Sequence, residues 1–314
     1  MSVQARLPLA LRDSCVVVFI NSAAGGGRAR VYLPRIRRVF ESFQIRAQFV
    51  MTNSASELES SAKIAISQDQ HVLLAMGGDG TFQALVNAAF GANVVLGVLP
   101  IGGGNDFAAA LGLPSDPVKA AEAVLCGQPR LVDLVRAHTA DGLTRLYAGG
   151  GGVGLDAEAA HYASGAYRHL PGRLRYIAST LRALVGYRPL DVRVDFPGSD
   201  LPPFKARSLL VAVLNSPTYG AGLRLAPGAS VEDGSLHVVM IEELSKFGVL
   251  TLLPRLMWSG DLRTSRVKRW RVPRVRLTTG RSRLFHGDGE ILGTTPVEIE
   301  VVPRAIQALV PWKD

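Results

Sequence analysis

The chain has 314 residues, enough for about two domains at roughly 150 residues each. Its apolar content of 47% and charged content of 19% are typical of a globular protein and exclude a disordered or fibrous one. The net charge of +9 favours an anionic partner, such as nucleic acid, lipid headgroups or a phosphorylated substrate. Cys15 and Cys126 are too few for a disulfide scaffold or a CxxC zinc site, so we expect a reducing, cytoplasmic environment.

The apolar runs of the sequence are too short to cross a bilayer, which takes roughly 18 residues or more. Pro100 and several glycines interrupt the run at 94–104, and Pro254 and Arg255 interrupt the run at 247–258. The sequence therefore predicts a protein that is soluble or rests on a membrane surface without spanning it.

The first part of the chain alternates apolar strand-like runs with amphipathic segments. Strands are predicted at 15–21, 44–52, 71–80 and 94–106, the last two running into glycine loops, and helices at 28–43, 56–67 and 81–89. Ser54 or Ser56 is the expected N-cap of the second helix. This β-α-β-α order predicts a parallel sheet with helices on both faces.

The pattern changes near residue 131. Two strands joined by a turn at Asp141–Gly142 are predicted over 131–149, followed by a helical stretch at 157–187. Short strands are then predicted at 191–196, 208–215, 235–241, 272–279 and 297–302. Turn residues separate these strands, which favours an antiparallel β-sandwich. The predicted fold is therefore an α/β domain at 1–135 and a β-sandwich domain at 136–314, with the last residues free to return to the first domain.

Three glycine-rich loops follow predicted strands, at 21–27 (NSAAGGG), 77–81 (GGDGT) and 102–106 (GGGND). In an open parallel sheet, ligands bind beyond the carboxyl ends of the strands, so these loops predict one shared site. Glycine lets backbone N–H groups approach phosphate oxygens closely, and none of the loops is a Walker A or GxGxxG sequence. The alternative is that the glycines only form tight turns.

The second loop carries a carboxylate, Asp79, where a plain anion pocket would not place one. The residue is explained if Asp79 meets a divalent cation or takes a proton from an attacking hydroxyl. The alternative is a helix N-cap before Thr81.

With these loops, the sequence resembles the catalytic domain of diacylglycerol kinases and related lipid kinases, including bacterial lipid kinases and sphingosine and ceramide kinases. The resemblance runs through most of the chain in ordered blocks: NSAAGGG (21–27), GGDGT with PIGGGNDFA (100–108), VDL (132–134), GVGLDA (152–157), LAPGASVEDGSL (225–236) and GDGE (287–290). GGDGT alone is shared with NAD kinases and phosphofructokinases, whereas the ordered set is much more specific.

The resemblance implies a nucleotide site for ATP in the first domain. The matching positions are Asn21, Thr52, Gly77, Gly78, Asp79, Gly80, Thr81, Phe82, Gln83, Gly103 and Asn105. Three departures weaken the match around ATP. Gly103 stands where bacterial relatives usually carry Thr, Ser22 replaces the usual Pro of the first loop, and Gly149 stands where Asn is common.

The resemblance also implies a magnesium network and a catalytic base. Asp79, Asp133 and Asp233 match acids that organise Mg²⁺ in bacterial relatives, and Ser230 and Ser235 match further metal positions. Glu290 matches the proton acceptor, with Asp79 as the alternative base. Phosphoryl transfer needs phosphate binding, a metal and a base, and the residues supply all three. The alternative for Glu290 is a solvated acid in a hairpin.

The positive charge gathers at 168–188 and 263–283, with Tyr167, Tyr176, Trp258 and Trp270 close by. These stretches suit an anionic membrane surface, so we expect peripheral membrane contact. The alternative is an ordinary solvated basic face. Nucleic acid is not an expected partner, since no helix-turn-helix, zinc-finger or RNP1 pattern occurs.

Taken together, the sequence predicts an ATP- and Mg²⁺-dependent kinase that transfers the γ-phosphoryl group to a lipid hydroxyl, of diacylglycerol or a sphingoid-like alcohol. One alternative is an NAD kinase-type phosphotransferase acting on a soluble substrate. The other is a non-catalytic lipid-binding protein with the same scaffold. The sequence leaves a homodimer open.

Overall fold

The computed structural model describes residues 15–167, 170, 172–245, 247–249, 251 and 265–312. The chain divides into two compact units, the first formed by 1–132 with 304–314 and the second by 133–303. Each unit has buried hydrophobic residues of its own.

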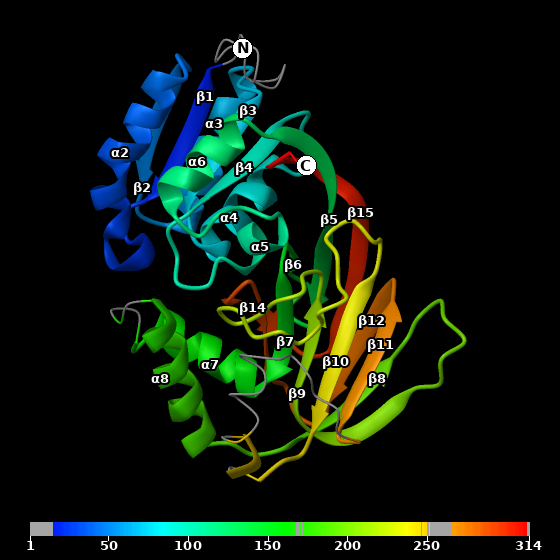
Figure 1. The fold of residues 1–314 in the computed structure, drawn as a ribbon. Coiled ribbons are helices and arrows are strands. Elements are labelled where there is room, and N and C mark those ends of the chain that lie inside the picture. Colours follow the sequence, from blue (N-terminus) through cyan, green and yellow to red (C-terminus); the bar gives the residue numbers. More distant parts are fainter. Residues whose placement is uncertain are drawn as a thin grey trace. The chain divides into compact units, whose positions relative to one another are not determined.

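The first unit is built on a parallel sheet with the strand order β2-β1-β3-β4 (Figure 1). Its strands are β1 (Val16–Asn21), β2 (Ala47–Thr52), β3 (Val72–Gly77) and β4 (Val95–Pro100). Its helices are α2 (Arg28–Ser42), α3 (Ala55–Ser67), α4 (Asp79–Ala89), α5 (Asp106–Ala110) and α6 (Pro117–Leu125), with a short 3-10 turn at Ala24–Gly26. Residues Gln307 and Ala308 of β15 (Val297–Val310) pair in parallel with β4.

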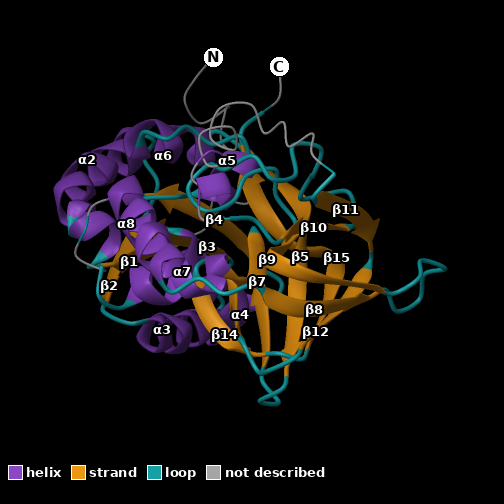
Figure 2. Cartoon of the chain, turned by 90° about the horizontal axis from the view of Figure 1, so that it is seen from below, coloured by secondary structure: helices purple, strands orange, loops and turns teal. Residues whose placement is uncertain are grey.

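Helices cover both faces of this sheet, which explains why its central strands are apolar throughout. In Figure 2, α2 and α6 lie on one face, and α3 and α4 lie on the other. Every residue of β3 and β4 is buried, as expected for parallel strands covered on both sides. Of the two candidate caps of α3, Ser54 is the one used, since its hydroxyl accepts the N–H of Glu57 at 3.1 Å.

The second unit is an antiparallel β-sandwich that also contains helices. Its strands are β5 (Gln128–Thr139), β6 (Thr144–Tyr147), β7 (Gly150–Gly154), β8 (Leu190–Asp195), β9 (Phe204–Leu214), β10 (Leu236–Glu242), β11 (Val267–Val272), β12 (Arg274–Thr279), β13 (Leu284–Gly287), β14 (Glu290–Thr294) and the first part of β15. Its helices are α7 (Leu155–Ser164) and α8 (Gly172–Val185). The predicted fold class, a parallel α/β unit followed by an antiparallel sandwich, is confirmed.

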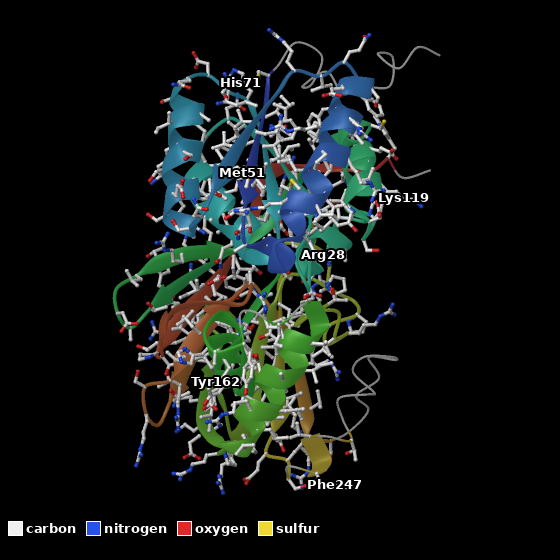
Figure 3. All side chains as sticks on the ribbon, turned by 90° about the vertical axis from the view of Figure 1, so that its left-hand side faces the viewer. Arg28, Met51, His71, Lys119, Tyr162 and Phe247 are labelled. Carbon is white, nitrogen blue, oxygen red and sulfur yellow. The ribbon has the colours of Figure 1, made fainter. Side chains whose placement is uncertain are left out.

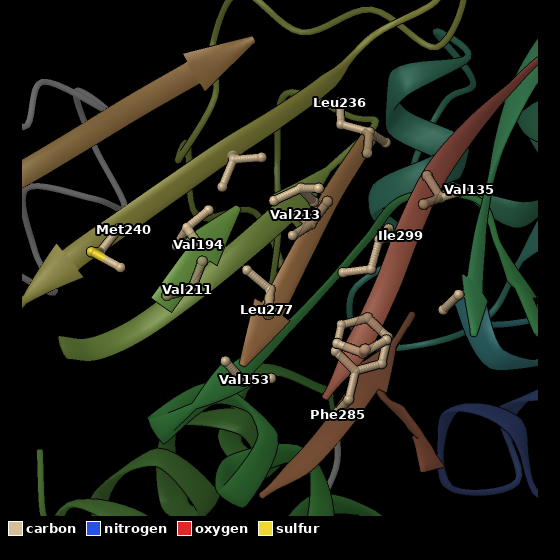
Figure 4. Close-up of a cluster of buried hydrophobic side chains, with 14 of the residues drawn as sticks. Val135, Val153, Val194, Val211, Val213, Leu236, Met240, Leu277, Phe285 and Ile299 are labelled. Carbon is tan, nitrogen blue, oxygen red and sulfur yellow. The ribbon is translucent and has the colours of Figure 1, made fainter. Parts of the chain in front are cut away.

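The core of the second unit comes from the inward-facing residues of many strands (Figure 4). Val153, Val211, Leu277, Phe285 and Ile299 are all completely buried in one cluster. This cluster holds β7 and β13 in place, and those two strands border the candidate catalytic residues described below.

Several elements differ from the prediction. The single strand predicted at 272–279 is two strands, β11 and β12, separated by Pro273, which has no N–H group to donate to a sheet. The helical stretch predicted at 157–187 is two helices, α7 and α8. Among the described residues, no helix is both long and apolar enough to cross a membrane.

Candidate functional site

The three glycine-rich loops lie at the carboxyl ends of β1, β3 and β4, which are neighbouring parallel strands. The first two loops are joined by a hydrogen bond in which Asn21 Nδ2 donates to Thr81 Oγ1 at 3.1 Å. The second and third are joined where the N–H of Ile101 donates to the Gly77 carbonyl at 2.8 Å. The loops therefore meet at one edge of the sheet.

Asp79 links the second loop to the third through its carboxylate. Its Oδ2 accepts the N–H of Asp106 and its Oδ1 accepts the N–H of Phe107, both at 3.2 Å. Asp79 does not cap its own helix, because α4 has Gly78 as its N-cap without a side-chain bond. The alternative that Asp79 caps the helix before Thr81 was therefore wrong. The carboxylate instead binds the N–H groups at the start of α5, which lies 27 residues further along the chain.

Glycine is required where the second and third loops approach each other. A Cβ atom on Gly102 would lie 2.6 Å from the Cα of Gly78, so neither residue tolerates a side chain without movement. A Cβ atom on Gly77 would lie 2.2 Å from Thr81 Oγ1. Both loops thus have no side chain at this point of close approach.

Asn105 carries an unsatisfied polar atom at the same place. The residue adopts a left-handed conformation (φ 58°), and its Nδ2 donates to the Gly102 carbonyl at 2.9 Å. Its Oδ1 is buried without a hydrogen-bond partner. A buried acceptor left without a donor destabilises a fold, so this atom fits a ligand that donates a hydrogen bond, as a ribose hydroxyl or an amino group does.

Other residues predicted to bind the nucleotide are buried next to the loops. Thr52 is buried at the end of β2, and its hydroxyl donates to the Ile20 carbonyl at 3.2 Å. Phe82 is buried and stacks on Phe107 with ring centroids 4.9 Å apart, and Gln83 is buried on the same helix. Gly80 and Gly103 are only partly buried. Direct nucleotide contact by these residues stays a prediction.

The first loop uses glycine for its conformation. Gly25, Gly26 and Gly27 are consecutive left-handed residues with φ values of 61°, 70° and 89°. The N–H groups of Gly26 and Gly27 already donate to the carbonyls of Ala23 and Ala24. A phosphate at this loop would therefore have to be bound by other groups, such as the Arg28 side chain at the start of α2 (Figure 3).

In the second unit, the predicted metal residues gather around one loop. Asp133 is 1% exposed, and its Oδ2 accepts the N–H of Gly234 at 2.7 Å. Asp233 Oδ1 accepts the N–H of Ser235, and its Oδ2 lies 2.9 Å from His237 Nε2. Ser230 Oγ accepts the N–H of Glu232 at 3.3 Å. Asp133, Ser230, Asp233 and Ser235 are thus brought together, whereas Asp79 belongs to the other unit.

These residues offer oxygen donors for a metal. Within the part of the chain that the structure describes, no three His, Cys, Asp or Glu side chains are arranged to hold a metal ion. The carboxylates and hydroxyls present are nevertheless the hard oxygen donors that Mg²⁺ takes, and Mg²⁺ is commonly bound by one or two carboxylates together with substrate phosphates. The donor set fits a metal that arrives with a nucleotide.

Glu290 stands at the end of a tight hairpin. Gly287 of β13 pairs with Glu290 of β14, so Asp288 and Gly289 form a two-residue turn with φ values of 51° and 86°, the combination of a type I′ turn. The carboxylate of the partly buried Asp288 accepts the N–H groups of Ala148, Gly149 and Gly150 at 2.7, 2.9 and 3.1 Å. This turn is therefore fixed to the start of β7.

The two acids of the turn have altered acidity. Burial raises the pKa of Asp288 to about 6, against the lowering effect of its three N–H donors. The surrounding protein also raises the pKa of Glu290 by desolvation, although the residue itself is exposed, and His286 and then Arg175 lower it. Glu290 is thus a stronger base than a fully solvated glutamate.

Asp288 gives a test of this burial. Because its pKa is about 6 in the folded state and 3.8 in the unfolded reference, the folded state holds its proton more tightly between these values. The contribution of this group to stability is full below pH 3.8 and falls as the pH rises through 6. We expect the free energy of unfolding in urea of the native protein, relative to that of Asp288→Asn, to fall by on the order of 2 kcal/mol between pH 4 and pH 7. An identical difference at both values would contradict this burial.

Sequence reasoning missed part of the surroundings of Glu290. The sequence analysis assigned no role to His286, which is buried in contact with Tyr219, and Tyr219 in turn contacts Asp156. The available signal was the glycine run 149–152 ahead of Asp156, which leaves room for these side chains.

Part of the second predicted basic stretch, 263–283, is paired within the fold. Arg274 and Arg276 form ion pairs with Glu300 and Glu298 at 2.6 and 2.7 Å. The Trp270 ring packs against Phe196 with centroids 5.3 Å apart. Arg168, Trp258 and the side chain of Tyr176 lie outside the described residues.

Comparisons with known proteins match both parts of the chain. The family model described as diacylglycerol kinase catalytic domain matches residues 15–137, and the one described as YegS C-terminal NAD kinase beta sandwich-like domain matches residues 151–310, more than half of the chain. A diacylglycerol kinase of Mycobacterium tuberculosis is 29% identical over 248 residues, 79% of each chain. A diacylglycerol kinase of Bacillus subtilis is 25% identical over 297 residues, 94% of this chain and 95% of that one.

A solved structure shares the fold at lower identity. The crystal structure of a diacylglycerol kinase from Bacillus anthracis superposes with a TM-score of 0.69 at 17% identity, covering 95% of this chain and 97% of that one. With both family models matched in order along 15–137 and 151–310, the chain belongs to the diacylglycerol kinase family of lipid kinases.

Proposed function

We propose that this protein is an ATP- and Mg²⁺-dependent kinase that phosphorylates the hydroxyl of a lipid, either diacylglycerol or a sphingoid-like alcohol. The observation that carries the proposal is the direct linkage of the three glycine-rich loops by Asn21–Thr81 and by Asp79 with the N–H groups of Asp106 and Phe107. Family membership supports a kinase that uses a nucleotide.

Two features of the first unit support nucleotide binding. The unpartnered Oδ1 of Asn105 suits a hydroxyl or amino group of the nucleoside. Arg28 stands at the first residue of α2, at the positive end of the helix dipole. A cation there is unfavourable unless an anion binds nearby, so this position suits the phosphates.

Mg²⁺ would be held by Asp133 and the neighbouring oxygen donors together with the nucleotide phosphates, and it would neutralise the charge that develops on the transferred group. In the reaction, the lipid hydroxyl oxygen forms a bond to the γ-phosphorus, and the bond from that phosphorus to the β–γ bridging oxygen breaks. Glu290 accepts the hydroxyl proton, and its raised pKa favours this step. ADP and a lipid phosphate result.

The function is tested with purified protein, ATP labelled at the γ-phosphate, Mg²⁺ and separate micelles of dioleoylglycerol or sphingosine. We expect label in one of the lipid products. Label on NAD⁺ in a parallel reaction, without lipid labelling, would identify the NAD kinase-type alternative. Binding of the lipid without any transfer would identify a non-catalytic lipid-binding protein.

We also propose peripheral contact with the membrane that holds the substrate. Helix α8 exposes four aliphatic side chains spaced three or four residues apart, Leu174, Ile177, Leu181 and Val185, so they form one face. Leu174 is 60% exposed and Val185 is 68% exposed, opposite the buried Ala183. The helix contains three arginines and no acid, which suits an anionic lipid surface.

This contact predicts weaker binding to vesicles when the α8 face becomes polar. The double change Ile177→Ser with Leu181→Ser should reduce co-sedimentation with 1:1 phosphatidylglycerol–phosphatidylcholine vesicles by about tenfold, because less apolar surface enters the bilayer. The matched control is Val31→Ser with Ile64→Ser, which alters two exposed aliphatic residues on α2 and α3. Equal binding by both double variants would remove α8 from the membrane contact.

A further inference from the structure

The block GVGLDA (152–157) has no part in the proposed reaction, but its Gly152, like the neighbouring Gly150, lies against a polar side chain. A Cβ atom on Gly152 would lie 2.3 Å from Asp156 Oδ2, and one on Gly150 would lie 2.9 Å from the Tyr219 ring. Strand β7 therefore has glycine at the positions where Asp156 and Tyr219 pack against it.

Asp156, Tyr219 and His286 form a hydrogen-bonded chain, called here the Asp156 relay. Tyr219 Oη donates to Asp156 Oδ2 at 2.7 Å and lies 2.5 Å from His286 Nε2. A tyrosine hydroxyl has one proton, and because that proton goes to the carboxylate, His286 Nε2 is the donor to Tyr219. The order of donation is thus His286 to Tyr219 to Asp156.

The relay is shielded from water. Tyr219 is 7% exposed and His286 is 4% exposed, and the Asp156 side chain is comparably buried. Tyr219 also belongs to an apolar cluster with Leu155 and Leu214. The other ring nitrogen of His286, Nδ1, is buried without a hydrogen-bond partner. A buried hydrogen-bonded chain of this kind rigidifies the structure when all its members are bonded. Each side chain of the relay therefore fixes the orientation of the next one.

The relay joins the hairpin that carries Glu290. His286 pairs with Gly152 of β7 on one side and with Ile291 of β14 on the other. The hairpin is therefore held at two points, by Asp288 on the backbone at 148–150 and by His286 on Tyr219. Both points lie within four residues of Glu290.

The charged groups around Glu290 come from three parts of this unit. Desolvation raises its pKa, while His286 on β13 and Arg175 on α8 lower it, and Asp288 in the turn raises it. Around the relay, Glu158 on α7 has a pKa raised by burial, lowered in part by Arg283 and raised by Asp156. His286 is the group that both the relay and Glu290 have in common.

We propose that Asp156, Tyr219 and His286 are positioning residues for the catalytic base: the relay fixes the β13–β14 hairpin and thereby holds the Glu290 carboxylate in its reactive place. The proposal rests on the proposed function, because it assigns the residues that orient the base of that reaction. No relay residue contacts substrate in this assignment.

The first test is Tyr219→Phe, which removes both hydrogen bonds and keeps the ring. We expect kcat to fall by roughly tenfold to a hundredfold while KM for ATP stays within about twofold, because one or two buried hydrogen bonds that orient the base are lost. The matched control is Tyr187→Phe, which removes a hydroxyl outside the relay from a residue packed on the same apolar cluster. Equal kcat in the two variants would overturn the proposal.

Two changes at His286 separate orientation from charge. Glutamine retains an N–H donor near the position of Nε2, whereas leucine does not. We expect His286→Gln to recover most of the kcat lost in His286→Leu. In both variants the acid limb of the pH profile of kcat should move to higher pH, because the electrostatic effect by which His286 lowers the pKa of Glu290 is gone. Equal kcat losses in both would mean that the histidine only fills space.

A readout without activity keeps the two proposals distinct. Amide hydrogen exchange at 287–291 should be at least tenfold faster in Tyr219→Phe than in Tyr187→Phe, with exchange in β3 unchanged. If the hairpin exchanges faster but no substrate is phosphorylated by the native protein, the relay stands and the proposed kinase function fails. Unchanged exchange at 287–291 would overturn the relay even in an active kinase.

Discussion

Replacing Glu290 with glutamine is expected to lower kcat for lipid phosphorylation by about a hundredfold to ten-thousandfold, the usual contribution of a general base. Glutamine has nearly the same shape but cannot accept the hydroxyl proton. KM for ATP should change little, because the proposed nucleotide residues lie on the loops of the first unit. Kinetics across pH 5 to 9 check the result, since the acid limb of kcat should disappear with the base.

The fold should survive this change. Glu290 is exposed, so its replacement removes no buried contact, and the hairpin keeps the three N–H bonds of Asp288. Glu298→Gln is the matched control, because it removes another acid of the same unit, in an ion pair with Arg276 that is worth at most about 1 kcal/mol. If Glu290→Gln keeps the kcat of the control, the base is Asp79 or another group.

The architecture of the first unit could be predicted because each local signal agreed with the others. Apolar runs such as 72–76 are buried on both faces, and the strands β1, β3 and β4 end in glycine loops that precede a helix. The elements that escaped prediction lack such signals. Strand β7 has the sequence GGGVG, which shows no alternation, and it is a strand only because β9 and β13 pair with it.

The hairpin of β13 and β14 carried a usable signal, which the sequence analysis used only in its alternative for Glu290. Asp288–Gly289 is the dipeptide that favours a type I′ turn, and such a turn implies two paired strands around it. Its short flanks, with glycines at 287 and 293, obscure the strand pattern. A glycine in a strand often marks a close approach, and here Gly287 packs on Tyr147.

The partners of the candidate site could not be read from the sequence. Asp79 binds backbone groups 27 and 28 residues away, and Tyr219 meets His286 across 67 residues. Local patterns give the residue type and the strand end but contain no information on contacts at that separation. Sequence reasoning therefore gave His286 no functional role, whereas its burial beside Tyr219 connects it to the Glu290 hairpin.

Replacing Asp79 with asparagine is expected to reduce kcat/KM for ATP by at least a hundredfold and to raise the Mg²⁺ concentration needed for half-maximal activity. The physical reason is the loss of a negative charge in the loop proposed to meet the metal and the phosphates, where charge-assisted contacts are the strong ones. Initial rates at varied ATP and Mg²⁺ provide the measurement. The competing explanation is structural, since the Asp79 carboxylate already binds the first N–H groups of α5.

The chain offers a matched control for that explanation. Asp116 accepts the N–H groups of Val118 and Lys119 at 2.9 and 3.0 Å, which is the same structural task at the start of α6 in the same unit. Asn remains a good acceptor at such positions, so both Asp→Asn variants should lose no more than about 1 kcal/mol of unfolding free energy. If Asp79 serves only the start of α5, the two variants will share the same stability and the same activity. A loss of turnover confined to Asp79→Asn, at equal stability, assigns the carboxylate to the nucleotide and its metal.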